Sequence, residues 1–156
     1  MHPATLPPFS APVPRDLRVE TVGLDTLDTV RALNRAIFDE ERVINTFDRD
    51  GLLILLALAD GEPCGFKIGY RENRHTFYSA KGGVLAAYRR YGVARRLLHA
   101  MEAEVRARGF THFAYDTFPN RHPGMTVLGL GEGFRLVRAD FNAGYGDYRL
   151  RFEKRL

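Results

Sequence analysis

The chain has 156 residues, of which 45% are hydrophobic and 27% are charged, a composition typical of one soluble globular domain. The formal net charge is +4, but acidic residues are interspersed with basic ones and no basic tract stands out, which argues against a nucleic-acid partner. The single cysteine, Cys64, excludes an internal disulfide framework and a cysteine-based zinc site. The histidines show no metal-binding spacing, so no metal is expected.

The N-terminal segment, residues 1–15, contains five prolines and no hydrophobic periodicity, and we predict that it is a flexible tail. It lacks the apolar region of a signal peptide, which favours a cytoplasmic location. Residues 16–156 show regular patterns without a linker or a repeat and are predicted to form one domain.

The first predicted elements are a strand and a helix. Residues 17–22 alternate between apolar and polar side chains, as a half-buried strand does. Asp25 is predicted to cap the helix that follows. The apolar positions of that helix recur at helical spacing and are Leu27, Val30, Leu33 and Ile37.

Three strands of a meander come next, at residues 52–59, 64–72 and 76–85. The first, LLILLALA, is far shorter than the roughly 20 apolar residues that span a bilayer, so it is predicted to be a buried strand and no membrane contact is expected. The pair Gly82 and Gly83 is poor strand material and indicates either a β-bulge or a close backbone approach.

A long helix begins at Gly92 and ends before Gly109, and its apolar face comprises Val93, Leu97, Leu98, Met101 and Val105. A strand, a short helix and two closing strands are expected at residues 111–118, 123–133, 134–139 and 147–156. The long helix is a crossover, so the strands before and after it should run parallel. The order of elements predicts an α/β domain with a mixed sheet.

The junction RRYGVAR, residues 89–95, has the parts of a pyrophosphate cradle: a glycine, a helix N-terminus and arginines. A glycine turn with solvated arginines is the alternative interpretation. The glycines of GLGEG, residues 129–133, do not follow the first strand, so they do not form a dinucleotide-binding fingerprint.

The segment GGVLAAYRRYGVARRLLHAMEAEVRARGF resembles the acetyl-CoA-binding core of the GNAT superfamily of N-acetyltransferases. The family pattern Arg/Gln-x-x-Gly-x-Gly/Ala is matched by Arg89, Gly92 and Ala94. Farther along, TFPNRHPGMTVLGLGEGF resembles the fifth strand and fourth helix of the family, with Asn120 and the closing Gly-Phe pair. The close resemblance covers about residues 76–134.

The resemblance implies a GNAT fold: a mixed sheet of six to seven strands with helices on both faces, whose strands four and five splay apart to hold acetyl-CoA. Backbone groups of strand four would pair with the pantetheine, and N–H groups of the next loop would surround the pyrophosphate. Asn120 would bind the pantetheine or help to hold the cleft. The implied cofactor-binding residues are Gly83, Val84, Leu85, Arg90, Tyr91, Gly92, Val93, Ala94, Arg95 and Asn120.

The resemblance also implies direct attack of an amine on the thioester, helped by a backbone N–H near Leu85 that polarises the carbonyl. Many members use a tyrosine of the fourth helix to protonate the thiolate, and this chain has Gly129 there. Tyr115 takes a position that carries a glutamate in some relatives and is the candidate catalytic residue; the alternative interpretation is an aromatic side chain that only packs in a half-buried strand. Asp116, on the opposite face of the strand, is either a surface carboxylate or a second candidate.

These features predict an acetyl-CoA-dependent N-acetyltransferase acting on a primary amine of a small molecule or peptide. The absent helix tyrosine keeps an alternative open, a catalytically degenerate GNAT domain that binds acyl-CoA as a sensor or interaction module. In this family the acceptor usually contacts the first helix with the segment after it and the last hairpin, here residues 34–50 and 140–148. The sequence identifies neither the acceptor nor whether the chain forms a homodimer.

Overall fold

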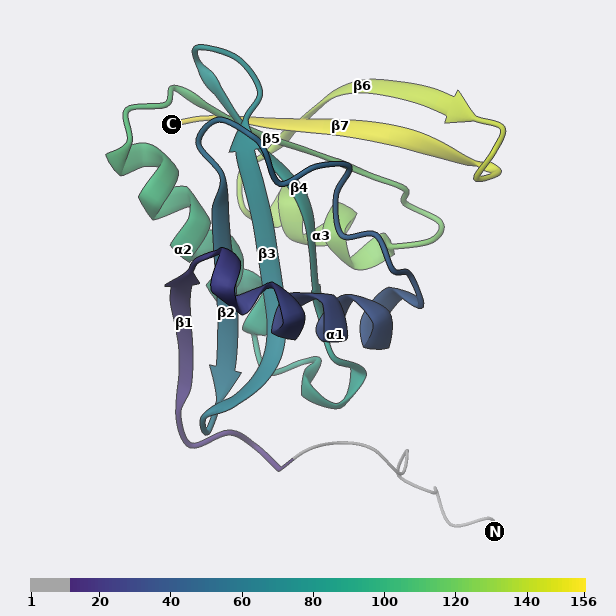
Figure 1. The fold of residues 1–156 in the computed structure, drawn as a ribbon. Coiled ribbons are helices and arrows are strands. Elements are labelled where there is room, and N and C mark those ends of the chain that lie inside the picture. Colours follow the sequence, from purple (N-terminus) through teal and green to yellow (C-terminus); the bar gives the residue numbers. More distant parts are fainter. Residues whose placement is uncertain (1–11) are drawn as a thin grey trace, which may run out of the picture.

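The computed structural model describes residues 12–156, which build a seven-stranded mixed sheet with helices on both faces (Figure 1). Most of the predicted tail, residues 1–15, lies outside the described residues. No helix within residues 12–156 is long and apolar enough to cross a membrane. In chain order the elements are β1 Leu17–Val22, a 3₁₀ turn Leu24–Thr26, α1 Leu27–Phe38, β2 Leu53–Ala59, β3 Glu62–Arg71, β4 Thr76–Val84, a 3₁₀ turn Ala86–Tyr88, α2 Val93–Ala107, β5 His112–Thr117, α3 Pro123–Gly131, β6 Arg135–Asn142 and β7 Asp147–Arg155.

The strands follow the order β1-β2-β3-β4-β5-β7-β6 across the sheet. All neighbouring pairs are antiparallel except β4 and β5, which run parallel because α2 carries the chain back between them. The predicted crossover is therefore confirmed. The loop between Val84 and Val93, which joins β4 to α2, therefore lies at the end of the sheet where β4 ends.

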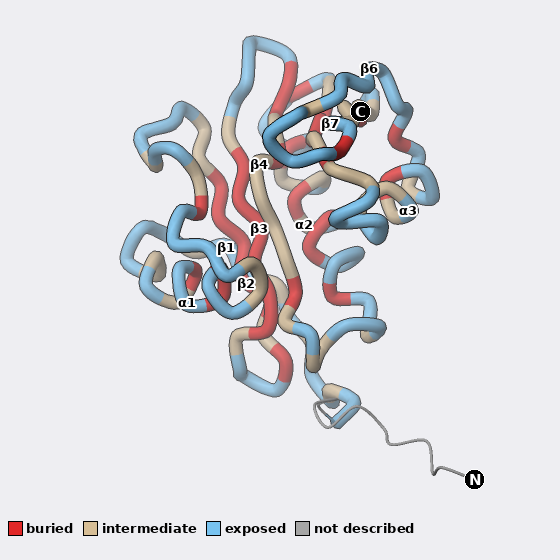
Figure 2. The backbone as a smooth tube through the Cα atoms, turned by 90° about the vertical axis from the view of Figure 1, so that its right-hand side faces the viewer, coloured by how far each residue is buried: buried red, intermediate tan, exposed pale blue. Residues whose placement is uncertain are grey.

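Each face of the sheet has its own hydrophobic core. Residues of β2 supply both, because successive side chains of a strand point to opposite faces. Ile54 and Leu56 join the core under α1, whereas Leu53 and Leu55 join the core shared by α2 and α3. This explains why β2 is a continuous apolar run rather than an alternating one, and Figure 2 shows the buried residues concentrated along the central strands.

The predicted start of the first helix needs a correction. Asp25 lies inside the 3₁₀ turn, and α1 begins at Leu27 after Thr26, whose side chain makes no capping hydrogen bond. The prediction that Asp25 caps α1 is wrong because the extra turn moves the helix start by one residue. The polar stretch after α1 is irregular, and the buried Asn34 orders it by donating through Nδ2 to the Glu40 carbonyl at 2.7 Å.

Candidate functional site

A gap between β4 and β5 lies at the centre of the candidate site. The two strands pair only along Thr76–Ser79 and His112–Tyr115. Beyond this point β4 continues to Val84, with β3 on one side and no strand of residues 12–156 on the other. The backbone edge of residues 80–84 is therefore open to an extended ligand, as a sheet edge is to an added strand.

The glycine pair in β4 has two explanations. A Cβ on Gly83 would lie 2.9 Å from Ile37 Cγ2 and from Phe38 Cζ, so the close approach at this glycine is made by side chains at the end of α1 rather than by a backbone. The β-bulge lies two residues earlier than Gly82, because the register changes between Ile68–Lys81 and Gly69–Ser79 and leaves Ala80 unmatched.

The backbone groups at the end of β4 are divided between β3 and the gap. The Leu85 N–H donates to the Cys64 carbonyl at 2.8 Å, and the Leu85 carbonyl accepts from the Tyr88 N–H at 2.9 Å. Since backbone groups point alternately to the two sides of a strand, the Val84 N–H points into the gap. The N–H near Leu85 expected to polarise a thioester is thus that of Val84 rather than that of Leu85.

The loop before α2 presents its backbone N–H groups in a concave arrangement. Gly92 caps the helix in the left-handed conformation, with φ 75°, and Arg90 also has a positive φ of 70°. The first helical hydrogen bond joins the Arg96 N–H to the Gly92 carbonyl at 3.0 Å, so the N–H groups of residues 93–95 precede it. A Cβ on Gly92 would meet nothing within 4 Å. This arrangement suits a phosphate group.

The side chains of Val93 and Arg95 contact other parts of the protein rather than the concave face of the loop. Val93 is buried in the core, and the guanidinium of Arg95 binds Glu132 after α3, with Nε 2.9 Å from Oε1. His99 reaches the same carboxylate at 2.7 Å. A hydrogen bond from His99 lowers the pKa of Glu132. The predicted contribution of Arg95 to an anion site therefore rests on its backbone N–H.

Asn120 holds one wall of the gap. Its Nδ2 donates to Oδ1 of the buried Asp147 at 2.7 Å, and its backbone N–H donates to Oδ2 at 2.9 Å. Burial alone would raise the pKa of Asp147, but hydrogen bonds from Asn120, Tyr148 and Arg121 lower it instead. The Asn120 side chain thus fastens the β5–α3 loop to the start of β7, which favours the second of its two predicted roles.

Tyr115 fills the space where a side chain on residue 129 would begin. A Cβ on Gly129 would lie 1.7 Å from the Tyr115 hydroxyl oxygen. The hydroxyl donates to the Met125 carbonyl at 2.7 Å, and the ring stacks on Phe152 with centroids 5.3 Å apart. Burial raises the pKa of Tyr115 well above its usual value, so the phenol is protonated at neutral pH. The tyrosine and the glycine are a matched pair.

Lys67 is a charged residue that the sequence analysis did not single out. Its side chain is 5% exposed and makes no hydrogen bond or ion pair within residues 12–156. It lies against Gly82, where a Cβ would be 3.3 Å from Lys67 Cγ. Gly83 faces α1, so Gly82 and Lys67 face α2 and α3. Burial lowers the pKa of Lys67 to about 8.

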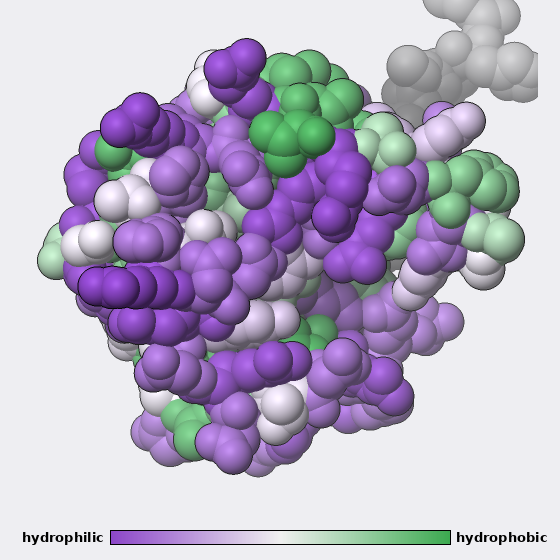
Figure 3. Space-filling view, turned by 90° about the horizontal axis from the view of Figure 1, so that it is seen from above, coloured by the Kyte–Doolittle hydropathy of each residue, from purple (hydrophilic) through white to green (hydrophobic). Residues whose placement is uncertain are grey.

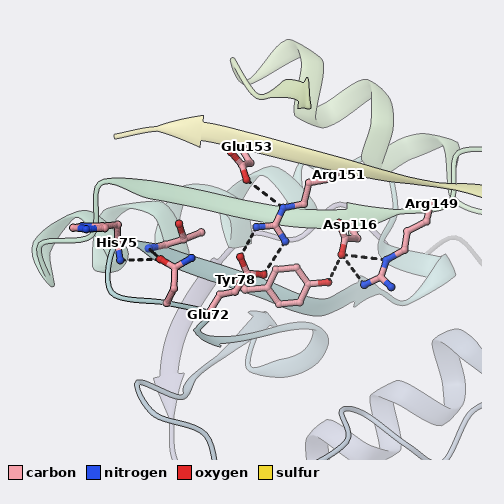
Figure 4. A network of polar contacts seen from close by, with 9 residues as sticks. Glu72, His75, Tyr78, Asp116, Arg149, Arg151 and Glu153 are labelled. Atoms are coloured by element: carbon pink, nitrogen blue, oxygen red, sulfur yellow. Dashed lines mark hydrogen bonds and ion pairs between the residues drawn. The ribbon is translucent and has the colours of Figure 1, made fainter. Parts of the chain in front are cut away.

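A polar network occupies the other face of the sheet, next to the point where β4 and β5 separate (Figure 4). Asp116 Oδ2 accepts hydrogen bonds from the Tyr78 hydroxyl at 2.8 Å and from Arg149 Nη2 at 2.7 Å. Asp116 Oδ1 is buried and has no hydrogen-bond partner in the described chain. Such an oxygen typically costs about 1–3 kcal/mol. Beside this cluster, Arg151 pairs with Glu72, with Nη1 2.7 Å from Oε2.

This network forms part of the wall of a cavity of about 350 Å³, here called the arginine pocket. The pocket is lined by Arg49, Tyr70, Arg71, Glu72, Tyr78, Asp116, Arg138, Arg149 and Arg151. Of the segments expected to contact an acceptor, residues 34–50 contribute Arg49, whereas 140–148 contribute none of the lining residues.

The Acetyltransferase (GNAT) family matches residues 24–126, a span that contains α1, the open edge of β4, the loop before α2, and Tyr115. The chain belongs to the GNAT acetyltransferase family. The GNAT match covers more than half of the 156 residues and agrees with the resemblance seen in the sequence. No curated protein matches the chain significantly by sequence.

Solved GNAT structures share the fold at low sequence identity. An IAA acetyltransferase from Bacillus cereus is 17% identical, with a TM-score of 0.78 over 90% of this chain and 100% of that one. The ribosomal-protein-S18-alanine N-acetyltransferase from Escherichia coli is 15% identical, with a TM-score of 0.77 over 90% and 94%. A GNAT acetyltransferase from Elizabethkingia anophelis with acetyl-CoA bound is 14% identical, with a TM-score of 0.75 over 91% and 99%. These likenesses confirm the predicted GNAT fold.

Proposed function

We propose that this GNAT protein is an acetyl-CoA-dependent N-acetyltransferase that modifies a primary amine by direct attack. The observation that carries the proposal is the continuous path from the open edge of β4 to the left-handed cap of α2 at Gly92. The edge is suited to an extended amide-bearing chain, and the cap is suited to a phosphate group. Support also comes from the family and from the acetyl-CoA bound to the structural neighbour.

The chain's own groups then have distinct tasks. The open edge of β4, through the backbone of Val84, aligns the pantetheine, and the N–H groups of residues 90–95 bind the pyrophosphate. Acetyl-CoA supplies the activated acetyl group: the amine nitrogen bonds to the carbonyl carbon, the carbon–sulfur bond breaks, the amine loses a proton and the thiolate gains one. Tyr115, protonated and next to α3, is our proposed proton donor to the thiolate.

A second function, acyl-CoA binding without turnover, is favoured by one observation. The Tyr115 hydroxyl occupies the Cβ position of residue 129, so this chain cannot carry the helix tyrosine of the family without repacking. Both functions require acetyl-CoA to bind. Release of free CoA in the presence of amines separates them, because a sensor releases none above the uncatalysed rate.

Acetyl-CoA should raise the melting temperature of the wild type, and Gly92→Val should remove the increase. A ligand at 100 times its Kd stabilises a protein by about 2.7 kcal/mol, or roughly 5–11 °C for a domain of this size. Valine is strained at positive φ and would project its side chain into the open space before α2. Thermal denaturation with and without acetyl-CoA measures the effect.

Gly61→Val is the matched control for Gly92→Val. Gly61 also has a positive φ, 83°, and open space around it, but it lies in the β2–β3 turn. This variant should suffer the same strain and keep the full response to acetyl-CoA. A folded Gly92→Val protein that responds as the wild type does would place the phosphate site elsewhere.

A further inference from the structure

The charge of the arginine pocket is unbalanced. Five arginines line it against two carboxylates. Both carboxylates are already engaged, since Asp116 binds Arg149 and Glu72 binds Arg151. The remaining three arginines, Arg49, Arg71 and Arg138, leave the pocket with a surplus of positive charge.

These three arginines have weak partners or none. Arg138 pairs with Asp140 at 3.1 Å, but both side chains are more than 60% exposed, and Arg71 pairs with the exposed Asp50 at 3.3 Å. Exposed pairs of this kind contribute little to stability. Arg49 has no ion pair within residues 12–156, and its guanidinium lies 4.5 Å from the centre of the Tyr70 ring. Their guanidinium groups remain able to bind an anion.

The pocket lies next to the reaction site proposed above. Its lining residues Tyr78 and Asp116 flank Ser79 and Tyr115, the last pair before β4 and β5 separate. They belong to the α1 side of the sheet, opposite Lys67 and Tyr115. An amine in the pocket would therefore approach an acetyl group in the gap from the face that α2 and α3 leave uncovered. The end of the molecule that carries the β3–β4 turn, seen from above in Figure 3, is mainly hydrophilic.

We propose that the acceptor is a small amine that also carries an anionic group, either a carboxylate or a phosphate. This inference rests on the proposed acetyltransferase function and names its substrate class. The anionic group binds Arg49 and Arg138, because guanidinium groups match carboxylate and phosphate oxygens in geometry and charge. The amine lies beside Asp116, a carboxylate that lines the pocket next to the point where β4 and β5 separate. A purely cationic amine would be repelled by the surplus arginines.

The test compares matched acceptors that differ only in the anionic group. The pairs are β-alanine with β-alaninamide and O-phosphoethanolamine with ethanolamine, each at equal concentrations of unprotonated amine. Release of free CoA is measured with saturating acetyl-CoA. We expect kcat/KM to be at least tenfold higher for the acidic member of at least one pair. The inference would be overturned if the acidic and the non-acidic member of each pair release CoA at equal rates. This holds whether both rates are high or both equal the uncatalysed rate.

Two variants test whether the preference for acidic amines comes from the arginine pocket. Arg49→Gln should raise KM for the preferred acidic amine about tenfold or more and leave KM for acetyl-CoA unchanged, since one charge-assisted contact is lost. Arg155→Gln, at an exposed site of β7 outside the pocket, is the matched control and should behave as the wild type. An Arg49→Gln enzyme with unchanged KM for acidic amines would also overturn the inference. The acetyltransferase proposal itself fails if no amine, whether acidic, neutral or cationic, releases free CoA above the uncatalysed rate, whereas turnover of non-acidic amines alone overturns only this acceptor class.

Discussion

Replacing Lys67 with methionine should raise the free energy of unfolding at pH 7 by about 3 kcal/mol. Lys67 is 5% exposed and its ammonium has no hydrogen bond or ion pair in the described chain, and burial lowers its pKa from 10.5 to about 8. Each pKa unit corresponds to about 1.4 kcal/mol, so a pKa lowered to about 8 corresponds to a penalty of about 3 kcal/mol at pH 7. Methionine has a similar length and no charge to desolvate. For a domain of this size the melting temperature should rise by about 6–12 °C.

The pH dependence of stability provides a second measurement of the same effect. Because the pKa of Lys67 is lower in the folded state, the unfolded chain binds more protons between pH 8 and pH 10.5. Lys67 therefore lowers the free energy of unfolding by its full amount below about pH 8. This loss of stability decreases as the pH rises from 8 to 10.5. Urea denaturation across this range should show this rise in the wild type, and Lys67→Met should lack it.

Lys81→Met is the matched control. Lys81 lies on the other face of the sheet, and its Nζ reaches the Arg42 carbonyl at 3.0 Å and the Glu40 carboxylate at 2.5 Å. Removing this paired ammonium should lower stability rather than raise it. A Lys67→Met protein that is less stable than the wild type would show that the ammonium has a favourable partner. Proteins keep such penalties mainly at functional sites, so we also expect the stabilised variant to turn over more slowly.

Local patterns were sufficient to predict most of the fold. The helical spacing in α2 and the continuous apolar run of β2 mark elements that the structure contains within one or two residues. The long crossover helix also determined the parallel pairing of β4 and β5. The prediction that Asp25 caps α1 is wrong because a helix cap and a 3₁₀ turn have the same residue preferences. Only packing decides where α1 begins.

The candidate site was predictable on one face of the sheet and not on the other. The cofactor side is built from a contiguous stretch, residues 80–95, whose glycines and helix start are visible in the sequence. The Asp116 cluster joins Tyr78 and Arg149, which lie 38 and 33 residues away, and only the strand register brings them together. One feature of the sequence marks Lys67 as unusual: it is a lysine inside the apolar predicted strand CGFKIGY, between two glycines. Its burial depends on the tertiary fold.

The loss of the Tyr115 hydroxyl should reduce turnover by about 100- to 10,000-fold, the usual contribution of a general acid. Tyr115→Phe keeps the ring in its stack on Phe152, so the variant should fold and bind acetyl-CoA. It removes the 2.7 Å hydrogen bond to the Met125 carbonyl, at a cost of about 0.5–1.5 kcal/mol. Single-turnover measurement of free CoA on a verified acceptor isolates the chemical step from substrate binding.

The contact with Gly129 separates a catalytic role of Tyr115 from a packing role. Gly129→Ala should destabilise the wild type by about 1–3 kcal/mol, because its Cβ would overlap the Tyr115 hydroxyl. In the Tyr115→Phe background the overlapping oxygen is gone and the nearest ring carbon lies 2.9 Å away, so the penalty should be smaller. This coupling in stability is expected whatever the chemistry. If Tyr115→Phe shows the coupling but keeps the wild-type kcat, the hydroxyl only fills the space beside α3, and another group protonates the thiolate.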